Sequence, residues 1–302
     1  MYDKNDPRSA LASASPSGPA PTGLIAEPQL GLFYESEPAS DDASGRTWYH
    51  RGCNFVLSWS DAKAGGRFER SSQPDEYVVL LPEKGKGARI TWNGMTTEVP
   101  GFSIAFVPPG DSLVETQSDG PLCRLFTVKS ADLVALCPNH NAYDQPRTHI
   151  PSFQPWPVPP KGWAVRHYSL DVPKEAGRFG RIFRCTTFMV NYLDPQQGPR
   201  DVHKLSPHHH DDFEQCSLAV TGSFTHHLRW PWTIDMDDWR ADRADHVQSP
   251  SSYVIPPPVI HTTRAMDAGF NQLVDIFCPP RFDFSEKRGW VLNADDYPMP
   301  AN

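Results

Sequence analysis

Two stretches in the first half of the sequence align with two stretches in the second half, and this internal repeat restricts the possible folds more than any other feature. Residues 74–81 (PDEYVVLL) align with residues 212–219 (DFEQCSLA). Residues 106–113 (FVPPGDSL) align with residues 254–261 (VIPPPVIH). A repeat of this length indicates two copies of one domain rather than one large irregular domain.

Short β-type segments separated by turn residues fill both copies. The 32 prolines and 20 glycines favour many short strands, and helical periodicity is nearly absent. Asn93-Gly94 between two such segments is a tight hairpin signal. This pattern predicts an all-β fold, a sandwich or barrel in each copy. The segments are residues 53–59, 76–81, 88–92 and 102–107 in the first copy, and 163–170, 181–190, 215–228, 252–255 and 271–278 in the second.

Composition divides the chain into four parts. Residues 1–28 are rich in Ser, Ala, Pro and Gly, and we expect a flexible N-terminal arm there. Residues 29–137 form the first copy, and residues 161–302 form the second. Between them, residues 138–160 contain many prolines and are expected to form a semi-rigid linker.

The second copy contains a cluster of side chains that suit a metal ion. In the stretch SPHHHDDFEQ, His208, His210 and Glu214 are two and four residues apart. On an extended strand these three share one face, and His209 points away. Imidazole and carboxylate donors suit iron, manganese, nickel or zinc. A solvated polar turn is the alternative, but His261 after a proline-rich turn offers a fourth donor and favours the metal site.

These two segments resemble the two halves of the cupin metal motif. The first half in cupins is His-x-His, three or four residues, a Glu and a later glycine turn, here supplied by Gly222. The second half is a proline-rich turn into a strand with one more His, with Pro258 where many cupins have glycine. A long insertion at residues 229–249 separates the halves. The resemblance implies four metal ligands: His208, His210, Glu214 and His261.

The resemblance covers about residues 45–285 and implies two tandem cupin barrels of the double-stranded β-helix, or jelly-roll, type. In the first copy, Arg70, Ser72 and Leu113 stand where the second has histidines, and only Glu76 remains. One carboxylate without imidazoles holds a transition metal poorly. We therefore expect a bicupin with a degenerate, metal-free first half and one divalent metal ion in the second half.

Bicupins with one active half are similar to ring-cleaving dioxygenases such as the gentisate and homogentisate enzymes. The resemblance thus implies an Fe(II) dioxygenase that cleaves a C–C bond in a small aromatic or enolisable carbonyl compound. Gentisate-type enzymes keep the metal in the first half and use three histidines, which this sequence does not match. Two alternatives stay open: a Mn, Ni or Zn lyase, isomerase or decarboxylase acting on a sugar or keto acid, and a metal-stabilised binding protein without activity.

Several neighbours are candidates for the substrate pocket. Thr263 shares the face of His261 by strand alternation. In the last strand either Gln272 or Asp275 faces inward, depending on register. Tyr253 could donate a proton or pack at the barrel rim. One of three residues beyond the Gly222 turn could bind a substrate carboxylate, or all could lie on an exposed hairpin: His226, His227 and Arg229. The tryptophan-rich residues 230–239 could form an aromatic lid over the metal or pack on the surface.

Charge and composition exclude other classes of function. The net charge is -8, and lysines and arginines form no stripe, so we expect no nucleic-acid partner. No apolar run reaches the roughly 20 residues that a membrane span needs, and no signal sequence is recognisable. Six scattered cysteines without a CxxC pair fit a reducing compartment, so we expect a cytoplasmic protein. The expected partner is a small-molecule substrate, and the sequence leaves a homo-oligomer open.

Overall fold

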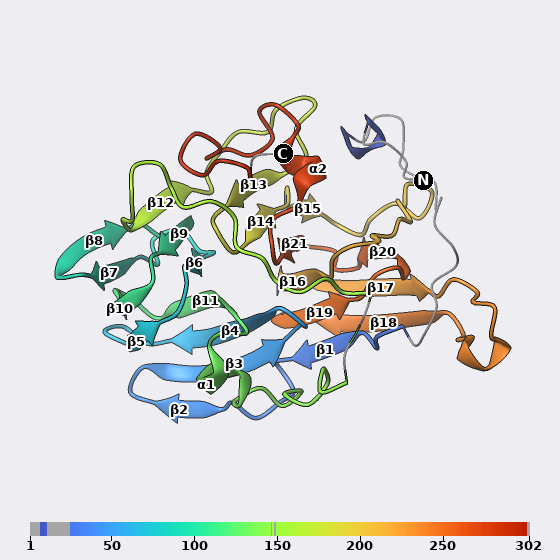
Figure 1. The fold of residues 1–302 in the computed structure, drawn as a ribbon, viewed down its shortest axis with the longest axis horizontal. Helices are drawn as coiled ribbons and strands as arrows, with labels where there is room; N and C mark the ends of the chain where they lie inside the picture. The colour runs from blue at the N-terminus through green and yellow to red at the C-terminus, as the bar shows by residue number, and fades with distance from the viewer. Residues whose placement is uncertain (1–6, 11–24, 146, 148, 301–302) are drawn as a thin grey trace.

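The structure is a computed structural model that describes residues 7–10, 25–145, 147 and 149–300. Most of the arm expected over residues 1–28 lies outside the described residues. Two β-barrels lie side by side, as the repeat predicts (Figure 1).

The first barrel consists of two antiparallel sheets that enclose one apolar core. That core draws on both sheets, for example through Phe68, Ile90 and Phe126. The larger sheet has the strand order β12-β9-β6-β11-β4-β3-β2 and the smaller one β5-β10-β7-β8. The strands are β2 (Ser40–Asp42), β3 (Gly45–Arg51), β4 (Phe55–Ala62), β5 (Arg67–Gln73), β6 (Tyr77–Leu81), β7 (Ala88–Trp92), β8 (Met95–Val99), β9 (Ser103–Val107), β10 (Gly110–Thr116), β11 (Gly120–Thr127) and β12 (Arg166–Ser169).

The second barrel repeats this plan with fewer strands in its smaller sheet. Its larger sheet has the order β1-β19-β16-β21-β14-β13, with β15 paired to β21, and its smaller sheet the order β18-β17-β20. The strands are β1 (Gln29–Leu32), β13 (Arg181–Arg184), β14 (Met189–Tyr192), β15 (Gln196–Gln197), β16 (Gln215–Thr221), β17 (Ser223–Arg229), β18 (Arg243–Gln248), β19 (Ser251–Ile255), β20 (Ile260–Ala265) and β21 (Phe270–Phe277).

Helices are few and short, as the sequence predicts. They are α1 (Ala131–Val134), α2 (Phe282–Ser285) and two 3-10 turns, η1 (Pro7–Ala10) and η2 (Met236–Asp238). Among the described residues, no helix has the length and apolar character needed to cross a membrane.

The predicted hairpin at Asn93-Gly94 joins β7 to β8, where Trp92 pairs with Met95. Both turn residues have positive φ, 47° for Asn93 and 73° for Gly94. A two-residue hairpin turn of this kind needs positive φ at both positions, which asparagine and glycine tolerate best.

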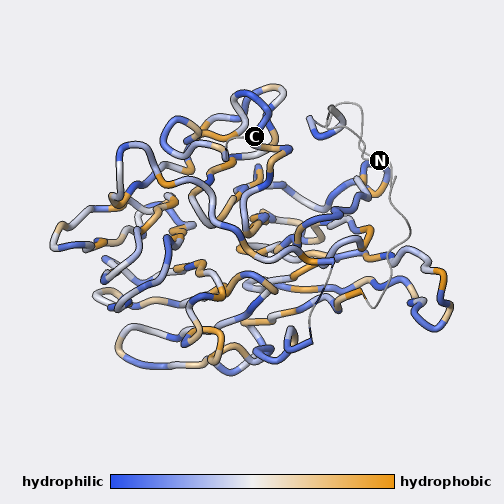
Figure 2. Tube along the Cα trace, viewed as in Figure 1, coloured by the Kyte–Doolittle hydropathy of each residue, from blue (hydrophilic) through white to orange (hydrophobic). Residues whose placement is uncertain are grey.

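The two larger sheets pack face to face and form the main core of the molecule. Strand alternation explains this arrangement, because one set of side chains points into each barrel and the other set points at the partner barrel. In β16, Cys216 and Leu218 belong to the core between the barrels, and Ala219 belongs to the core inside the second barrel. Figure 2 shows apolar positions recurring along these strands and hydrophilic residues in the loops.

Each barrel also receives one strand from the other part of the chain. Strand β1 pairs with β19 of the second barrel, with Leu30 opposite Tyr253. Strand β12 pairs with β9 of the first barrel, with Tyr168 opposite Ile104. Composition places β1 in the first half, residues 29–137, and β12 in the second half, residues 161–302. In the structure each of these strands belongs to the barrel of the other half.

Candidate metal centre

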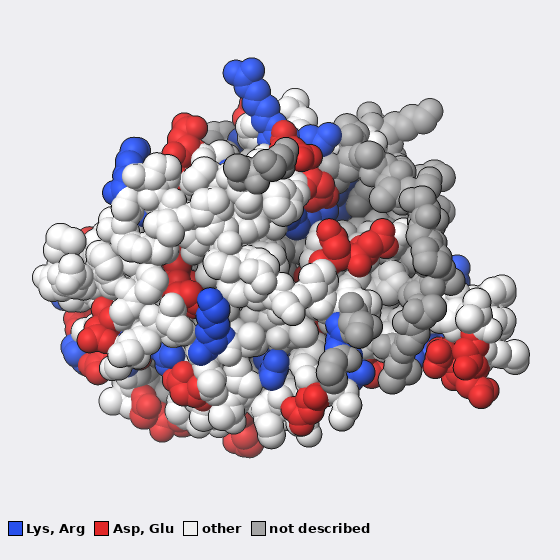
Figure 3. All heavy atoms as spheres, viewed as in Figure 1, with Lys and Arg blue, Asp and Glu red and all other residues white. Residues whose placement is uncertain are grey.

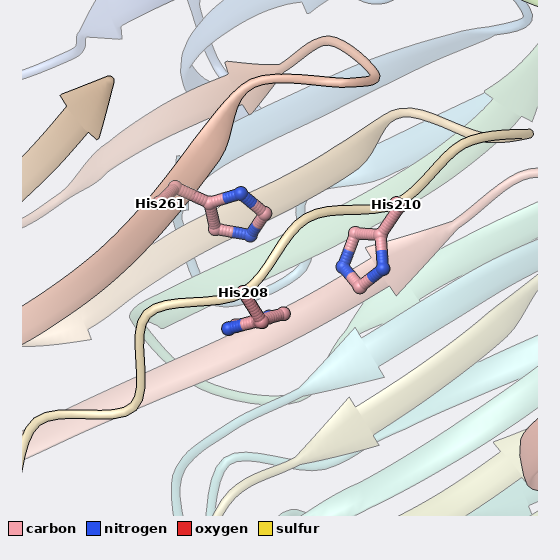
Figure 4. Close-up of side chains that lie close together, drawn as sticks. All are labelled: His208, His210 and His261. Atoms are coloured by element: carbon pink, nitrogen blue, oxygen red, sulfur yellow. The ribbon is translucent and has the colours of Figure 1, made fainter. Parts of the chain in front are cut away.

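Three of the four expected ligands lie close together in the second barrel (Figure 4). His208 and His210 lie on the irregular segment before β16, and His261 lies on β20. An isolated antiparallel bridge joins His208 to His261 through both backbone hydrogen bonds, of 3.0 and 2.7 Å. One ring nitrogen from each of the three histidines lies within 4.8 Å of the others. No other such group of His, Cys, Asp and Glu occurs in the described part of the chain.

Backbone carbonyl groups orient two of the three imidazole rings. His208 Nδ1 lies 2.8 Å from the Ser206 carbonyl oxygen, and His261 Nδ1 lies 2.9 Å from the Val259 carbonyl oxygen. A carbonyl oxygen can only accept, so each Nδ1 carries the proton and each Nε2 keeps its lone pair. A hydrogen bond from Nδ1 to a carbonyl oxygen is the usual way to present Nε2 to a metal.

Burial keeps these rings in the neutral form that binds metals. Desolvation lowers the pKa of His261 to about 4 and lowers the pKa of His208 and His210 well below the usual histidine range. Nearby positive charge, including that of Arg281 and Arg8, lowers the pKa of His261 further. Neutral imidazole is the ligating species, so the site needs no deprotonation at neutral pH.

Glu214 does not lie with the histidines, in contrast to the sequence expectation. A bend at residues 211–212 interrupts the extended chain, so the two-residue alternation from His210 does not continue to Glu214. The next residue, Gln215, points into the barrel instead, and its Oε1 lies 3.0 Å from His210 Nε2 and 3.4 Å from His261 Nε2. The cupin pattern of three or four residues after His-x-His includes this position.

The amide orientation of Gln215 makes the site suitable for a cation. Its Nε2 donates to Asp275 Oδ1 and Ser217 Oγ, both at 3.1 Å, so its Oε1 must face the histidines. That oxygen and the unprotonated His261 Nε2 are both acceptors, 3.4 Å apart. His210 Nε2 lies closer to that oxygen, at 3.0 Å, and carries the proton that it donates to it. A divalent ion bound here would take the place of that proton, with the three imidazoles and the Gln215 oxygen as its donors.

Glu214 instead connects the second barrel to the rest of the chain. Its carboxylate accepts hydrogen bonds from the Tyr143 hydroxyl and the Cys53 backbone N–H, both at 2.7 Å. Tyr143 lies in the proline-rich linker and Cys53 in the first half. Burial raises the pKa of Glu214 to about 7, and these two hydrogen bonds oppose that rise.

A cavity of about 520 Å³ opens beside the histidine cluster. This volume lies in the range of small-molecule sites. Its lining combines polar and charged groups from both sheets of the second barrel and from the turn η1. Those on which the chemistry depends are Arg8, Arg200, His208, Gln215, His261 and Asp275.

Of the pocket residues named from the sequence, Thr263 lines the cavity and Gln272 does not. The Thr263 hydroxyl lies 2.9 Å from His226 Nδ1. The register of β21, with Ser217 opposite Asp275, points Asp275 into the barrel. Gln272 has the opposite parity, and its amide donates to the carbonyl oxygens of Leu193 and Leu273.

Three other candidates lie away from the cavity. Tyr253 is buried, stacks on His226 with ring centroids 4.5 Å apart, and donates its hydroxyl to Asp245. Arg229 is exposed and forms an ion pair with Asp242. His227 faces outward from β17, because strand alternation turns its neighbour His226 inward.

The tryptophan-rich insertion does not cover the cavity. Its described residues form the tip of the β17–β18 hairpin, which projects from the second barrel (Figure 1). Trp232 and Trp239 stack with centroids 4.7 Å apart, and Trp232 is 74% exposed. Acidic side chains gather at the end of the molecule where this hairpin projects (Figure 3).

Sequence reasoning missed three residues of the site. The sequence could have indicated Gln215, because four residues separate it from His210, a spacing that the cupin pattern allows. Arg8 lies in a segment whose composition gave no structural signal, and Arg200 precedes the motif in an irregular loop. For these two arginines, the sequence contains no pattern that would have placed them beside the histidines.

Comparison with known proteins identifies the fold. No protein-family profile matches the sequence, and no curated protein matches it. Oxalate decarboxylase from Lactobacillus farciminis, in a formate complex, superposes with a TM-score of 0.56 at 12% identity over 86% of this chain and 88% of that one. A mutant of Bacillus subtilis oxalate decarboxylase gives 0.55 at 12% identity over 86% and 79%.

AerE from Microcystis aeruginosa superposes with a TM-score of 0.50 at 9% identity, over 85% of this chain and 99% of that one. These similarities span both barrels, because each covers 85% or 86% of this chain. The chain therefore has the two-barrel cupin fold of the bicupins, with its histidine cluster in the C-terminal barrel.

Proposed function

We propose that the protein is a mononuclear metal-dependent enzyme, a lyase or decarboxylase that acts on a small organic acid in the cavity of the second barrel. One observation carries this proposal: three neutral histidines and the carboxyl group of Asp275 line or adjoin the same cavity. Chemistry of this class needs a group that stabilises developing negative charge and a group that transfers a proton.

The residues of the chain divide these tasks between them. His208, His210 and His261 would hold a divalent ion, with Gln215 Oε1 beside them. When bound, that ion would act as a Lewis acid on an oxygen of the substrate. The nitrogen and oxygen donors suit iron, manganese, nickel or zinc.

Asp275 is the residue placed to handle a proton. Its Oδ1 accepts from Gln215 and Ser217, so a proton would be held at Oδ2. Burial raises the pKa of Asp275 to about 6. The charge of Arg8 and the hydrogen bonds that Asp275 accepts from Ser217 and Gln215 oppose that rise. Loss of carbon dioxide or of a leaving group creates negative charge at carbon, and a carboxyl group beside the cavity can protonate it.

A second candidate is an Fe(II) dioxygenase that cleaves a C–C bond. The observation in its favour is that the cluster consists of three histidines with no carboxylate among them. This set is similar to the three histidines of gentisate-type ring-cleaving enzymes. A purely structural metal site is less well supported, because the cavity beside the histidines is large enough for a small ligand.

Metal analysis, together with assays of oxygen uptake and carbon dioxide release, tests these two proposed functions. Purified protein should contain about one transition-metal ion per chain, and His208→Ala or His261→Ala should lose it. His246→Ala, which changes an exposed histidine outside the cluster, is the matched control. An oxygen electrode and a carbon dioxide assay on a panel of keto and sugar acids then separate the candidates. Oxygen uptake with substrate would favour the dioxygenase, and metal retention in the histidine variants would contradict both.

A further inference from the structure

The side chain of His226 lies behind the wall of the cavity and has one hydrogen-bond partner in the described part of the chain. His226 is on β17 opposite Thr263 of β20, and its Nδ1 lies 2.9 Å from Thr263 Oγ1. Thr263 lines the cavity, whereas His226 is only 1% exposed. The Tyr253 ring stacks on the imidazole and donates its own hydroxyl to Asp245, which holds the imidazole in place. His226 therefore reaches the cavity through Thr263.

The position of the proton on His226 decides what Thr263 offers to the cavity. Burial lowers the pKa of His226 to about 3, so the ring is neutral and carries one proton. Its Nε2 is buried and has no hydrogen-bond partner among the described residues. A proton on Nε2 would make a buried N–H without an acceptor, which is rarer in proteins than an acceptor without a donor. The proton therefore lies on Nδ1, which donates it to Thr263 Oγ1.

Because Thr263 Oγ1 accepts from His226, the Thr263 hydroxyl keeps its own hydrogen to donate. Strand alternation puts Thr263 on the same inner face as His261, and two residues along a strand correspond to roughly 6–7 Å. Both side chains line the cavity. A ligand bound beside His261 can thus place a second oxygen atom against the Thr263 hydroxyl.

We propose that His226 is a positioning residue, which orients the Thr263 hydroxyl to donate to a carbonyl oxygen of the ligand. The cavity therefore favours 2-oxo acids over acids that have no oxygen at this carbon. A carbonyl oxygen accepts the hydroxyl hydrogen, whereas a C–H group in the same place leaves that donor unpaired. This inference rests on the proposed function in treating the occupant of the cavity as the substrate.

NMR on the full chain at pH 7, after removal of metal with EDTA, tests both steps. Nitrogen-15 correlation spectra show which ring nitrogen of His226 carries the proton, and His226→Asn identifies the His226 signals. We expect the proton on Nδ1. Ligand-observed titrations then compare pyruvate with propionate, which has the same carboxylate but lacks the oxo oxygen. The wild type should bind pyruvate about tenfold more tightly than propionate.

Variants of both residues separate the hydroxyl from the packing. Thr263→Val keeps the shape of threonine without the hydroxyl and should abolish the preference for pyruvate, and Thr263→Ser should keep it. His226→Phe should lose most of the preference, and His226→Asn should recover part of it, because its amide N–H can replace Nδ1–H. Thr225→Val is the matched control, because the Thr225 hydroxyl contacts His246 Nδ1 at 3.2 Å in an exposed position.

Three outcomes would overturn the proposal: a proton on Nε2, a wild type that does not bind pyruvate more tightly than propionate, or an unchanged preference in Thr263→Val. If the His226 variants do not fold, the wild type and the Thr263 variants decide. Metal is absent throughout these measurements. A chain that binds no metal would therefore contradict the proposed function and leave their outcome unaffected.

Discussion

Glu76 and Glu214 occupy equivalent positions in the two barrels, and each accepts a hydrogen bond of 2.7 Å from a tyrosine hydroxyl distant in sequence. Tyr297 donates to Glu76, and Tyr143 donates to Glu214. Both carboxylates are buried at the contact between the barrels and not inside them. The repeated glutamate therefore stabilises the packing of the two halves, and the residue after it faces the barrel interior.

We expect the loss of either tyrosine hydroxyl to destabilise the protein. Tyr143→Phe or Tyr297→Phe would remove one donor from a buried carboxyl group and should lower the free energy of unfolding by about 1–3 kcal/mol. Urea unfolding at pH 7 measures this change. Tyr34→Phe is the control, because the Tyr34 hydroxyl accepts an exposed hydrogen bond of 3.3 Å from the Gln248 backbone N–H. Variants as stable as the control would show that these contacts contribute nothing.

Metal affinity should depend on Gln215 and not on Glu214. Gln215→Ala removes the oxygen beside His210 and should weaken metal binding about tenfold to a hundredfold. Glu214→Gln changes a group that binds Tyr143 and Cys53, so metal content should be unchanged. Metal content after dialysis against a competing chelator gives the comparison. If Glu214→Gln lost its metal and Gln215→Ala kept it, the Glu214 carboxylate would be the metal ligand.

Asp275 should fix the orientation of the Gln215 amide. In Asp275→Asn the acceptor for Gln215 Nε2 is no longer charged, and the amide can turn its NH₂ group towards the histidines. Metal affinity should then fall about tenfold or more, and activity should fall with it. Asp242→Asn, at an exposed ion pair, is the control. If metal affinity is retained while activity is lost, Asp275 acts on the substrate alone.

Stability should fall as the pH drops from about 6.5 to about 4, in part because of His50. Burial lowers the pKa of His50 to about 4, and its ring lies 2.7 Å from Ser252 Oγ between the two halves. Below pH 6.5 the unfolded chain binds a proton that the folded chain does not, so the contribution of His50 is lost as the pH falls. Over this range the loss is about 3 kcal/mol.

His50→Asn tests this origin of the pH dependence, because asparagine can replace the hydrogen bond of Nδ1 but does not titrate. The free energy of unfolding would be measured by urea titration at pH 7, 6, 5 and 4. The variant should show a slope shallower by about one proton, or about 1.4 kcal/mol per pH unit. An unchanged slope would show that His50 titrates normally in the folded protein.

Local patterns in the sequence predicted the fold and the three histidines because both depend on short-range regularities. The Asn93-Gly94 turn and the His-x-His spacing act over a few residues, and the structure keeps both. Glu214 was misplaced because alternation holds only along a continuous strand, and a bend at residues 211–212 interrupts it. The choice between Gln272 and Asp275 required the strand register, which one sequence does not contain.

The exchange of β1 and β12 between the barrels bears on how this chain could be divided. A gene fragment cut at the proline-rich segment would encode the half with the histidine cluster but without β1, and strand β19 would then present an unpaired edge. Such edges recruit other chains, so the fragment should aggregate rather than yield a miniature enzyme. The first half is therefore needed for the stability of the second, and the two halves should melt together in one cooperative transition.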